Sequence, residues 1–123
     1  MAIDKQEIGR LGETAACEYL LKNGLMIIAR NFRTPHGEID IIARDKDAVI
    51  FLEVKTRSSD QFGNPEDAVD VTKASHMIDS AEYYLQTTGQ EDVDWQLDVI
   101  AIELNHKLGK AGIIRYENAV NDE

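Results

Sequence analysis

Two short apolar segments that carry regularly spaced charged residues decide the fold of this chain: Gly37-Glu38-Ile39-Asp40-Ile41-Ile42 and Phe51-Leu52-Glu53-Val54-Lys55. Successive side chains of a β-strand point to opposite faces of its sheet. On this count Glu38 and Asp40 share one face of the first segment, and Ile39 and Ile41 share the other. The first segment is therefore predicted to be a strand with one charged face and one apolar face.

The second segment places an acidic and a basic side chain on one face, because Phe51, Glu53 and Lys55 alternate with two apolar residues. If the two segments pair as neighbouring strands, carboxylates and a lysine converge on one patch. Hard oxygen ligands of this kind suit Mg²⁺ or Mn²⁺. The sequence therefore predicts a divalent metal site on this sheet.

The chemistry of phosphodiester hydrolysis gives each of these residue types a role. A metal ion neutralises the charge that develops on the phosphoryl oxygens and acidifies a bound water. We expect Asp40 and Glu53 to hold the ion, together with the backbone carbonyl of Val54. Lys55 would lie beside the attacked phosphate, orient or help to deprotonate the water, and stabilise negative charge in the transition state. Glu38 is a further candidate without a defined role.

The spacing of Asp40, twelve intervening residues and Glu53-Val54-Lys55 resembles the PD-(D/E)XK signature of the restriction-endonuclease-like superfamily, which includes archaeal Holliday-junction resolvases. Between residues 9 and 118 the chain is also similar to the bacterial YraN family. The ordered motifs that carry this similarity are Gly9-Arg10-Leu11-Gly12-Glu13 with Ala16 and Tyr19-Leu20, Asn31-Phe32-Arg33, Gly37-Glu38-Ile39-Asp40, Glu53-Val54-Lys55-Thr56-Arg57, Lys73, and Asp98-Val99-Ile100-Ala101.

The resemblance implies a restriction-endonuclease-like core, in which helices flank a mixed sheet. It also implies that Glu13, on the first helix, faces the metal site as an auxiliary acid; a solvated helix carboxylate is the alternative. The superfamily includes members that bind without cutting, so the resemblance by itself implies the fold more firmly than the activity.

Periodicity and turn residues predict one α/β domain over residues 1–123, in the order helix, three strands, helix, two strands. The predicted elements are a helix over 5–22, strands over 25–31, 38–43 and 48–55, a helical region from Pro65 to Gly89 with a break near Thr72, and strands over 95–104 and 113–117. Short connections predict that the first three strands are antiparallel. A polar loop is predicted over 56–64, where it could close over a substrate.

The net charge of −10 opposes a simple nucleic-acid interpretation, because phosphate binding relies on Lys and Arg. The charge is unevenly distributed. Residues 60–103 contain eleven acidic side chains and one basic side chain, whereas residues 22–57 contain seven basic and five acidic ones. We expect Arg33, Arg57 and Lys73 to bind phosphates, although each could equally be a solvated or ion-paired surface charge.

The remaining features indicate a cytoplasmic protein without an organic cofactor. The sequence contains neither a run of about 18 apolar residues nor a signal-peptide pattern, so we expect no membrane association. A single Cys17 agrees with a reducing compartment and is interpreted as a small buried helix residue. Among the histidines, only His36 in its predicted turn is a further candidate for the site.

Two hypotheses from different functional classes follow. The first is a Mg²⁺- or Mn²⁺-dependent DNA endonuclease, with branched DNA as a candidate substrate and a homodimer as a candidate assembly. The second is a non-catalytic nucleic-acid-binding or protein-interaction module that retains the nuclease fold. A simpler interpretation of Glu38, Asp40, Glu53 and Lys55 is a solvated sheet face held by cross-strand ion pairs.

Overall fold

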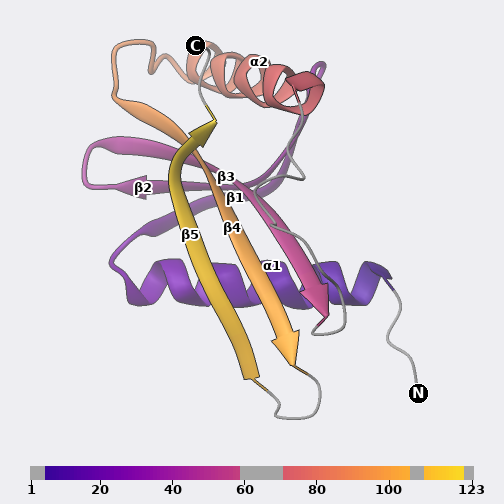
Figure 1. Cartoon of the computed structure of the whole chain (residues 1–123). Helices are drawn as coiled ribbons and strands as arrows, with labels where there is room; N and C mark the ends of the chain where they lie inside the picture. The colour runs from indigo at the N-terminus through magenta and orange to yellow at the C-terminus, as the bar shows by residue number, and fades with distance from the viewer. Residues whose placement is uncertain (1–4, 59–70, 106–109, 121–123) are drawn as a thin grey trace.

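The computed structural model describes residues 5–58, 71–105 and 110–120. Two helices and five strands follow one another in the predicted order, helix, three strands, helix, two strands (Figure 1). The elements are α1 (Lys5–Lys22), β1 (Met26–Thr34), β2 (Gly37–Asp45), β3 (Ala48–Ser58), α2 (Val71–Thr87), β4 (Trp95–Asn105) and β5 (Lys110–Val120).

The five strands form one mixed sheet in the order β1-β2-β3-β4-β5. The first three strands are antiparallel, as their short connections predict, and β5 is antiparallel to β4. By contrast, β3 and β4 run parallel, from Val49 beside Trp95 to Ser58 beside Leu104. Parallel neighbours need a crossover connection, and α2 lies within this one. The predicted mixed sheet flanked by helices is confirmed.

The two helices cover opposite faces of the sheet and create two apolar cores. Figure 1 shows α1 in indigo and α2 in salmon on either side of the strands. The α1 core contains Ala16, Cys17, Leu20, Leu25, Ile41, Ala43, Ile50, Leu52, Ile100 and Ile102. The α2 core contains Ile39, Ile42, Val49, Phe51, Met77, Ala81, Tyr84, Leu85, Leu97 and Val99. Because both faces are covered, β4 is apolar on both faces from Val99 to Ile102.

Cys17 lies in the α1 core, which confirms its interpretation as a buried helix residue. Burial raises the pKa of its thiol, and the positive charge of Arg30 only partly opposes this effect. A thiol with a raised pKa is a poor nucleophile at neutral pH.

Several predicted boundaries were wrong because the strands continue further than local sequence indicates. β3 continues to Ser58, so the predicted polar loop begins later, and its remainder over 59–64 lies outside the described residues. β4 continues to Asn105 and β5 already begins at Lys110, so the connection between them is shorter than predicted. The predicted helix start at Pro65 also lies outside the described residues. From Val71 to Thr87 the helix is continuous, and the segment just before it, where the predicted break near Thr72 would fall, lies outside the described residues.

The prediction that Ile39 and Ile41 share one face of β2 was wrong. Ile39 lies in the α2 core, whereas Ile41 lies in the α1 core. The partners of these two residues in β1 flank Asn31, which has a positive φ of 52°. A left-handed residue interrupts the regular pleat, so the side chains on either side of it are directed to opposite faces. This irregularity lies next to Asp40.

Candidate active site

A pocket of about 420 Å³ lies between the first turns of α1 and the adjoining parts of β2 and β3. It is lined by Lys5, Ile8, Gly9, Glu13, Asp40, Glu53, Val54, Lys55 and Thr56. The structure thus brings together, in one place, the three predicted metal ligands, the predicted catalytic lysine and the predicted auxiliary acid.

The pocket forms where β2 and β3 separate. These strands pair from Asp45 beside Ala48 to Ile41 beside Leu52, and the pairing ends there. Beyond this last pair, the Asp40 side chain takes the place of a backbone partner. Its Oδ2 accepts a hydrogen bond at 2.8 Å from the backbone N–H of Val54, two residues beyond Leu52. The fork between the strands therefore places a carboxylate against the backbone of the Glu53-Val54-Lys55 motif.

Asp40 and Glu53 are close enough to perturb each other. Glu53 is buried at 5% exposure. Burial, followed by repulsion from the Glu53 carboxylate, raises the pKa of Asp40 to about 7, although the hydrogen bond from Val54 opposes the shift. The two carboxylates therefore repel each other in a partly buried pocket. Such a pair is well suited to hold a cation.

Two lysines approach the same oxygen of Glu53. Lys55 Nζ lies 3.3 Å from Glu53 Oε1, and Lys73 Nζ, from the first turn of α2, contacts the same atom. Burial and the neighbouring Lys73 lower the pKa of Lys55. Burial also acts to lower the pKa of Lys73, but interactions with Glu53 and Lys55 outweigh it, so the pKa of Lys73 is raised.

The approach of α1 to the site depends on Gly12. A Cβ atom built on this residue would lie 1.8 Å from Thr56 Oγ1 and 2.7 Å from Thr56 Cβ, so only glycine permits this contact. The close approach places the next residue, Glu13, on the pocket wall. Glu13 Oε1 also lies 3.7 Å from Arg30 Nη2 on β1.

The remaining predicted residues lie elsewhere or at the margin. Glu38 does not line the Asp40 pocket; it lines an adjacent pocket with Lys73 and His76, so the predicted sharing of one face with Asp40 was wrong. Arg33 is exposed on β1 opposite Glu38. Arg57 is half-buried two residues beyond Lys55. His36 lies against Tyr83, with ring centroids 6.4 Å apart. Lys73 is thus the predicted phosphate binder that reaches Glu53.

The donor set fits a Mg²⁺-type ion that is completed by water and substrate. Among the described residues, no three acidic, histidine or cysteine side chains are grouped closely enough to form a site by themselves. Asp40 and Glu53 provide two carboxylates, and the backbone of Val54 is adjacent. Mg²⁺ commonly binds one or two carboxylates and retains several waters or substrate phosphates. Two carboxylates are therefore sufficient for this class of ion.

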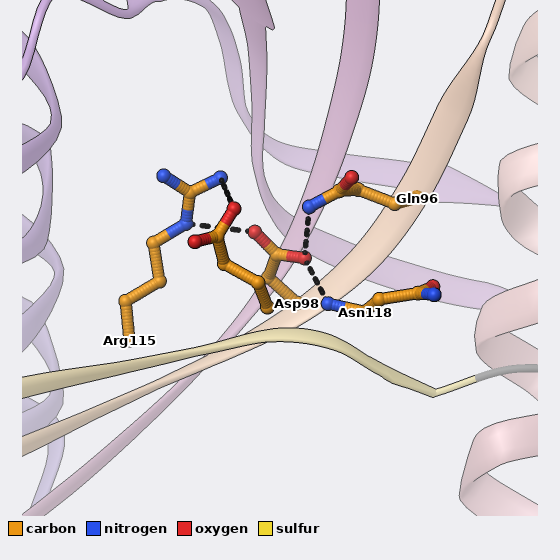
Figure 2. Close-up of polar contacts among 5 residues, drawn as sticks. Gln96, Asp98, Arg115 and Asn118 are labelled. Carbon is orange, nitrogen blue, oxygen red and sulfur yellow. Dashed lines mark hydrogen bonds and ion pairs between the residues drawn. The ribbon is translucent and has the colours of Figure 1, made fainter.

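A second buried carboxylate, Asp98 on β4, was not identified by sequence reasoning as a polar centre (Figure 2). It is fully buried and accepts hydrogen bonds from Arg115 Nε at 2.8 Å, Gln96 Nε2 at 2.9 Å and the backbone N–H of Asn118 at 2.8 Å. The β4–β5 register shifts beside Asp98, and Asn118 has a positive φ of 52°. A charged residue within an apolar strand was the only sequence signal for this cluster.

Comparison with known proteins places this site in a family context. The model of the uncharacterised protein family UPF0102 matches residues 12–102, a span that contains the pocket residues from Glu13 to Thr56. The chain belongs to this family. The finding confirms the predicted YraN membership, since YraN proteins form this family.

Three UPF0102 proteins illustrate how far this similarity extends. The protein from Caldicellulosiruptor saccharolyticus is 41% identical over 105 residues, covering 85% of this chain and 89% of the relative. The protein from Dictyoglomus thermophilum is 40% identical over 119 residues, covering 97% and 98%. The protein from Thermodesulfovibrio yellowstonii is 47% identical over 96 residues, covering 78% and 85%. These relatives match this UPF0102 protein over most of their length.

Among solved structures, the UPF0102 chain is similar to Pyrococcus furiosus SfsA in complex with Ca²⁺, with a TM-score of 0.42 and 16% identity. The match covers 98% of this chain and 66% of that chain. Separately, neither α1 nor α2, the helices of the described region, is long and apolar enough to cross a membrane.

Proposed function

We propose that this protein is a metal-dependent DNA endonuclease that hydrolyses phosphodiester bonds, with branched DNA as the first substrate to test. The observation that carries the proposal is the convergence of Asp40, Glu53 and Lys55 on one pocket at the fork between β2 and β3. Two mutually repelling carboxylates beside a lysine are costly for a purely structural role. The same arrangement suits the binding of a cation and a phosphate.

Each residue of the site has a defined task in this proposal. Asp40 and Glu53, with the backbone of Val54, hold Mg²⁺ or Mn²⁺, which when bound neutralises phosphoryl charge and acidifies a water. Lys55 Nζ lies beside Glu53 and orients the attacking water or stabilises negative charge on the phosphate. Glu13 acts as an auxiliary acid from α1, on the opposite wall of the pocket.

The distribution of charge supports binding of DNA on the side of the site. The net charge of −10 arises from residues 60–103, whereas residues 22–57 carry an excess of basic side chains. Arg57 lies two residues beyond Lys55 on β3, and Arg33 is exposed on β1. We propose that these arginines contact the DNA backbone. Phosphate contacts of this kind weaken as salt increases.

The first test is calorimetric titration with Mg²⁺ and Mn²⁺ at low salt, comparing wild type with Asp40→Ala and Glu53→Ala. Both substitutions are expected to abolish binding. Glu18→Gln is the matched control, because Glu18 is an exposed carboxylate on α1 that does not line the pocket. Metal binding that survives both alanine substitutions would contradict the assignment of the ligands.

The second test is cleavage of four-way junction, flap and linear duplex DNA. Lys55→Ala is expected to lower the rate at least about 100-fold while the circular dichroism spectrum stays unchanged. A non-catalytic module that retains the fold predicts a different result: wild type binds DNA, and neither wild type nor Lys55→Ala cleaves any of the substrates. The two functions are therefore separated by one set of measurements.

A further inference from the structure

Lys73 joins α2 to the candidate active site. It is the one residue of α2 for which the structure gives an ion pair to β3, and its ammonium contacts Glu53 Oε1. The Lys73 side chain is 38% exposed, whereas that of Glu53 is only 6% exposed. A partly exposed cation thus reaches a buried carboxylate from a different element of the fold.

Glu53 Oε1 is also the atom that faces Lys55, at 3.3 Å. In the proposed function, the Glu53 carboxylate binds a divalent ion. An ammonium in contact with a metal-bound carboxylate oxygen would lie within a few ångströms of the doubly charged metal ion, where repulsion between the two cations is strong. One lysine must therefore move when the ion binds. The Lys73 side chain is 38% exposed and that of Lys55 only 23%, and Lys55 already has a task at the phosphate, so Lys73 is the lysine we expect to move.

The adjacent pocket provides a place for the displaced ammonium. This pocket, of about 350 Å³, is lined by Gly37, Glu38, Thr72, Lys73, His76 and Met77. Its carboxylate, Glu38, is exposed on β2. Lys73 therefore lies between a buried carboxylate at the site and an exposed carboxylate beside it. A rotation about side-chain bonds is enough to exchange one for the other.

We propose that Lys73 is a displaceable counter-ion: its ammonium neutralises Glu53 in the metal-free protein, and a divalent ion expels it toward Glu38 and the surface. The inference rests on the proposed metal site and adds a regulatory step to it. The expelled ammonium becomes available to a DNA phosphate, so binding of the ion and binding of the nucleic acid reinforce each other.

The first measurement is calorimetric titration of Mn²⁺ into wild type, Lys73→Gln and Lys22→Gln. Lys22→Gln is the matched control, since it removes the same charge at an exposed position at the end of α1. Lys73→Gln is expected to bind Mn²⁺ about three- to tenfold more tightly than Lys22→Gln, because the competing cation is gone. Equal affinities in the two variants would overturn the proposal.

The second measurement follows the lysine itself. Wild-type protein is briefly treated with an amine-acetylating reagent in Mg²⁺ or in EDTA, and modification of Lys73 is quantified by mass spectrometry with Lys22 as reference. Release from Glu53 is expected to increase the acetylation rate of Lys73 severalfold in Mg²⁺. If wild type binds the ion and Lys73 reactivity is unchanged, the displacement is wrong but the metal site stands. If neither wild type nor Lys73→Gln binds an ion, the metal site fails as well.

Discussion

Asp40 and Asp98 are a half-buried and a fully buried carboxylate of the same sheet, and their surroundings are opposite in character. Asp98 accepts three hydrogen bonds, including a charged one from Arg115 at 2.8 Å, and is completely enclosed (Figure 2). Asp40 accepts a hydrogen bond from the Val54 amide and faces another carboxylate in an open pocket. The Asp98 cluster is closed and internally neutralised, whereas the Asp40 site is open and holds two mutually repelling carboxylates.

The difference shows how a structural carboxylate can be distinguished from a functional one. A buried charge whose hydrogen-bonding capacity is filled by its own protein has little left to offer a ligand. A buried charge that is poorly neutralised is maintained at a cost in stability. The cost at Asp40 is visible in its pKa, which burial and Glu53 raise to about 7.

The largest expected effect comes from removing the Asp98 carboxylate from its closed cluster. Asp98→Ala removes the buried partner of the Arg115 guanidinium and leaves it only the exposed Glu117, 3.6 Å away, so we expect a loss of about 3 to 5 kcal/mol in the free energy of unfolding. Urea denaturation followed by circular dichroism measures the change. The double variant Asp98→Ala, Arg115→Met is expected to recover most of the loss, since it removes both charges. A loss below about 1 kcal/mol for Asp98→Ala would show that the cluster is not structural.

A smaller effect is expected at the contact between Gly12 of α1 and Thr56 of β3, which positions α1 beside the Asp40 pocket. Gly12→Ala forces a Cβ into Thr56, so we expect a loss of about 1 to 3 kcal/mol and weaker Mn²⁺ binding. Gly9→Ala is the matched control, because a Cβ there meets nothing within 4 Å and alanine is the better helix former. Gly9→Ala should therefore be neutral or stabilising by up to about 1 kcal/mol. Equal effects of the two substitutions would mean that the close contact does not position α1.

The smallest effect tests the raised pKa of Asp40. The pKa of this carboxyl is raised from 3.8 to about 7 in the folded protein. The folded state therefore binds the proton more tightly than the unfolded state, so the stabilisation is complete below about pH 4 and is lost as the pH rises toward 7. In EDTA, wild type is expected to lose about 1 to 2 kcal/mol more than Asp40→Asn between pH 4 and 8.

Denaturation at each pH, with both proteins in the same buffers, measures this difference. Asparagine keeps an oxygen that can accept the Val54 hydrogen bond but carries no charge. Parallel pH profiles for the two proteins would contradict the raised pKa. A steeper loss of stability with pH in Asp40→Asn than in wild type would mean that the pKa of Asp40 is lowered, not raised, by folding.

The main elements of the fold could be predicted because local patterns and global packing agree. The alternation in Phe51-Leu52-Glu53-Val54-Lys55, the stop at Asn23-Gly24 and the doubly apolar middle of β4 each indicate the element that forms. The approximate position of the site also followed from the sequence. Asp40 lies one residue beyond the end of the β2–β3 pairing, and strand periodicity is sufficient to bring its segment beside Glu53.

What could not be predicted depends on contacts between distant parts of the chain. No local pattern shows that Lys73 crosses from α2 to Glu53, or that Arg115 pairs with Asp98. The positive φ of Asn31 interrupts the sheet where Ile39 and Ile41 turn to opposite faces. The regular alternation of side chains along a strand does not predict such an irregularity. The close contact of Gly12 with Thr56 likewise joins two elements that are distant in the sequence.

Because the backbone N–H of Val54 donates its hydrogen bond to Asp40, its exchange with solvent depends on the state of the pocket. Leu52 lies within the paired part of β2 and β3, whereas the N–H of Val54 is held by a side chain. Exchange of the Leu52 amide with deuterium therefore reflects opening of the sheet, but exchange at Val54 reflects the charge and occupancy of the pocket. Filling the site should change the protection of Val54 while that of Leu52 stays the same. The ratio of the two exchange rates therefore reports whether the pocket is occupied.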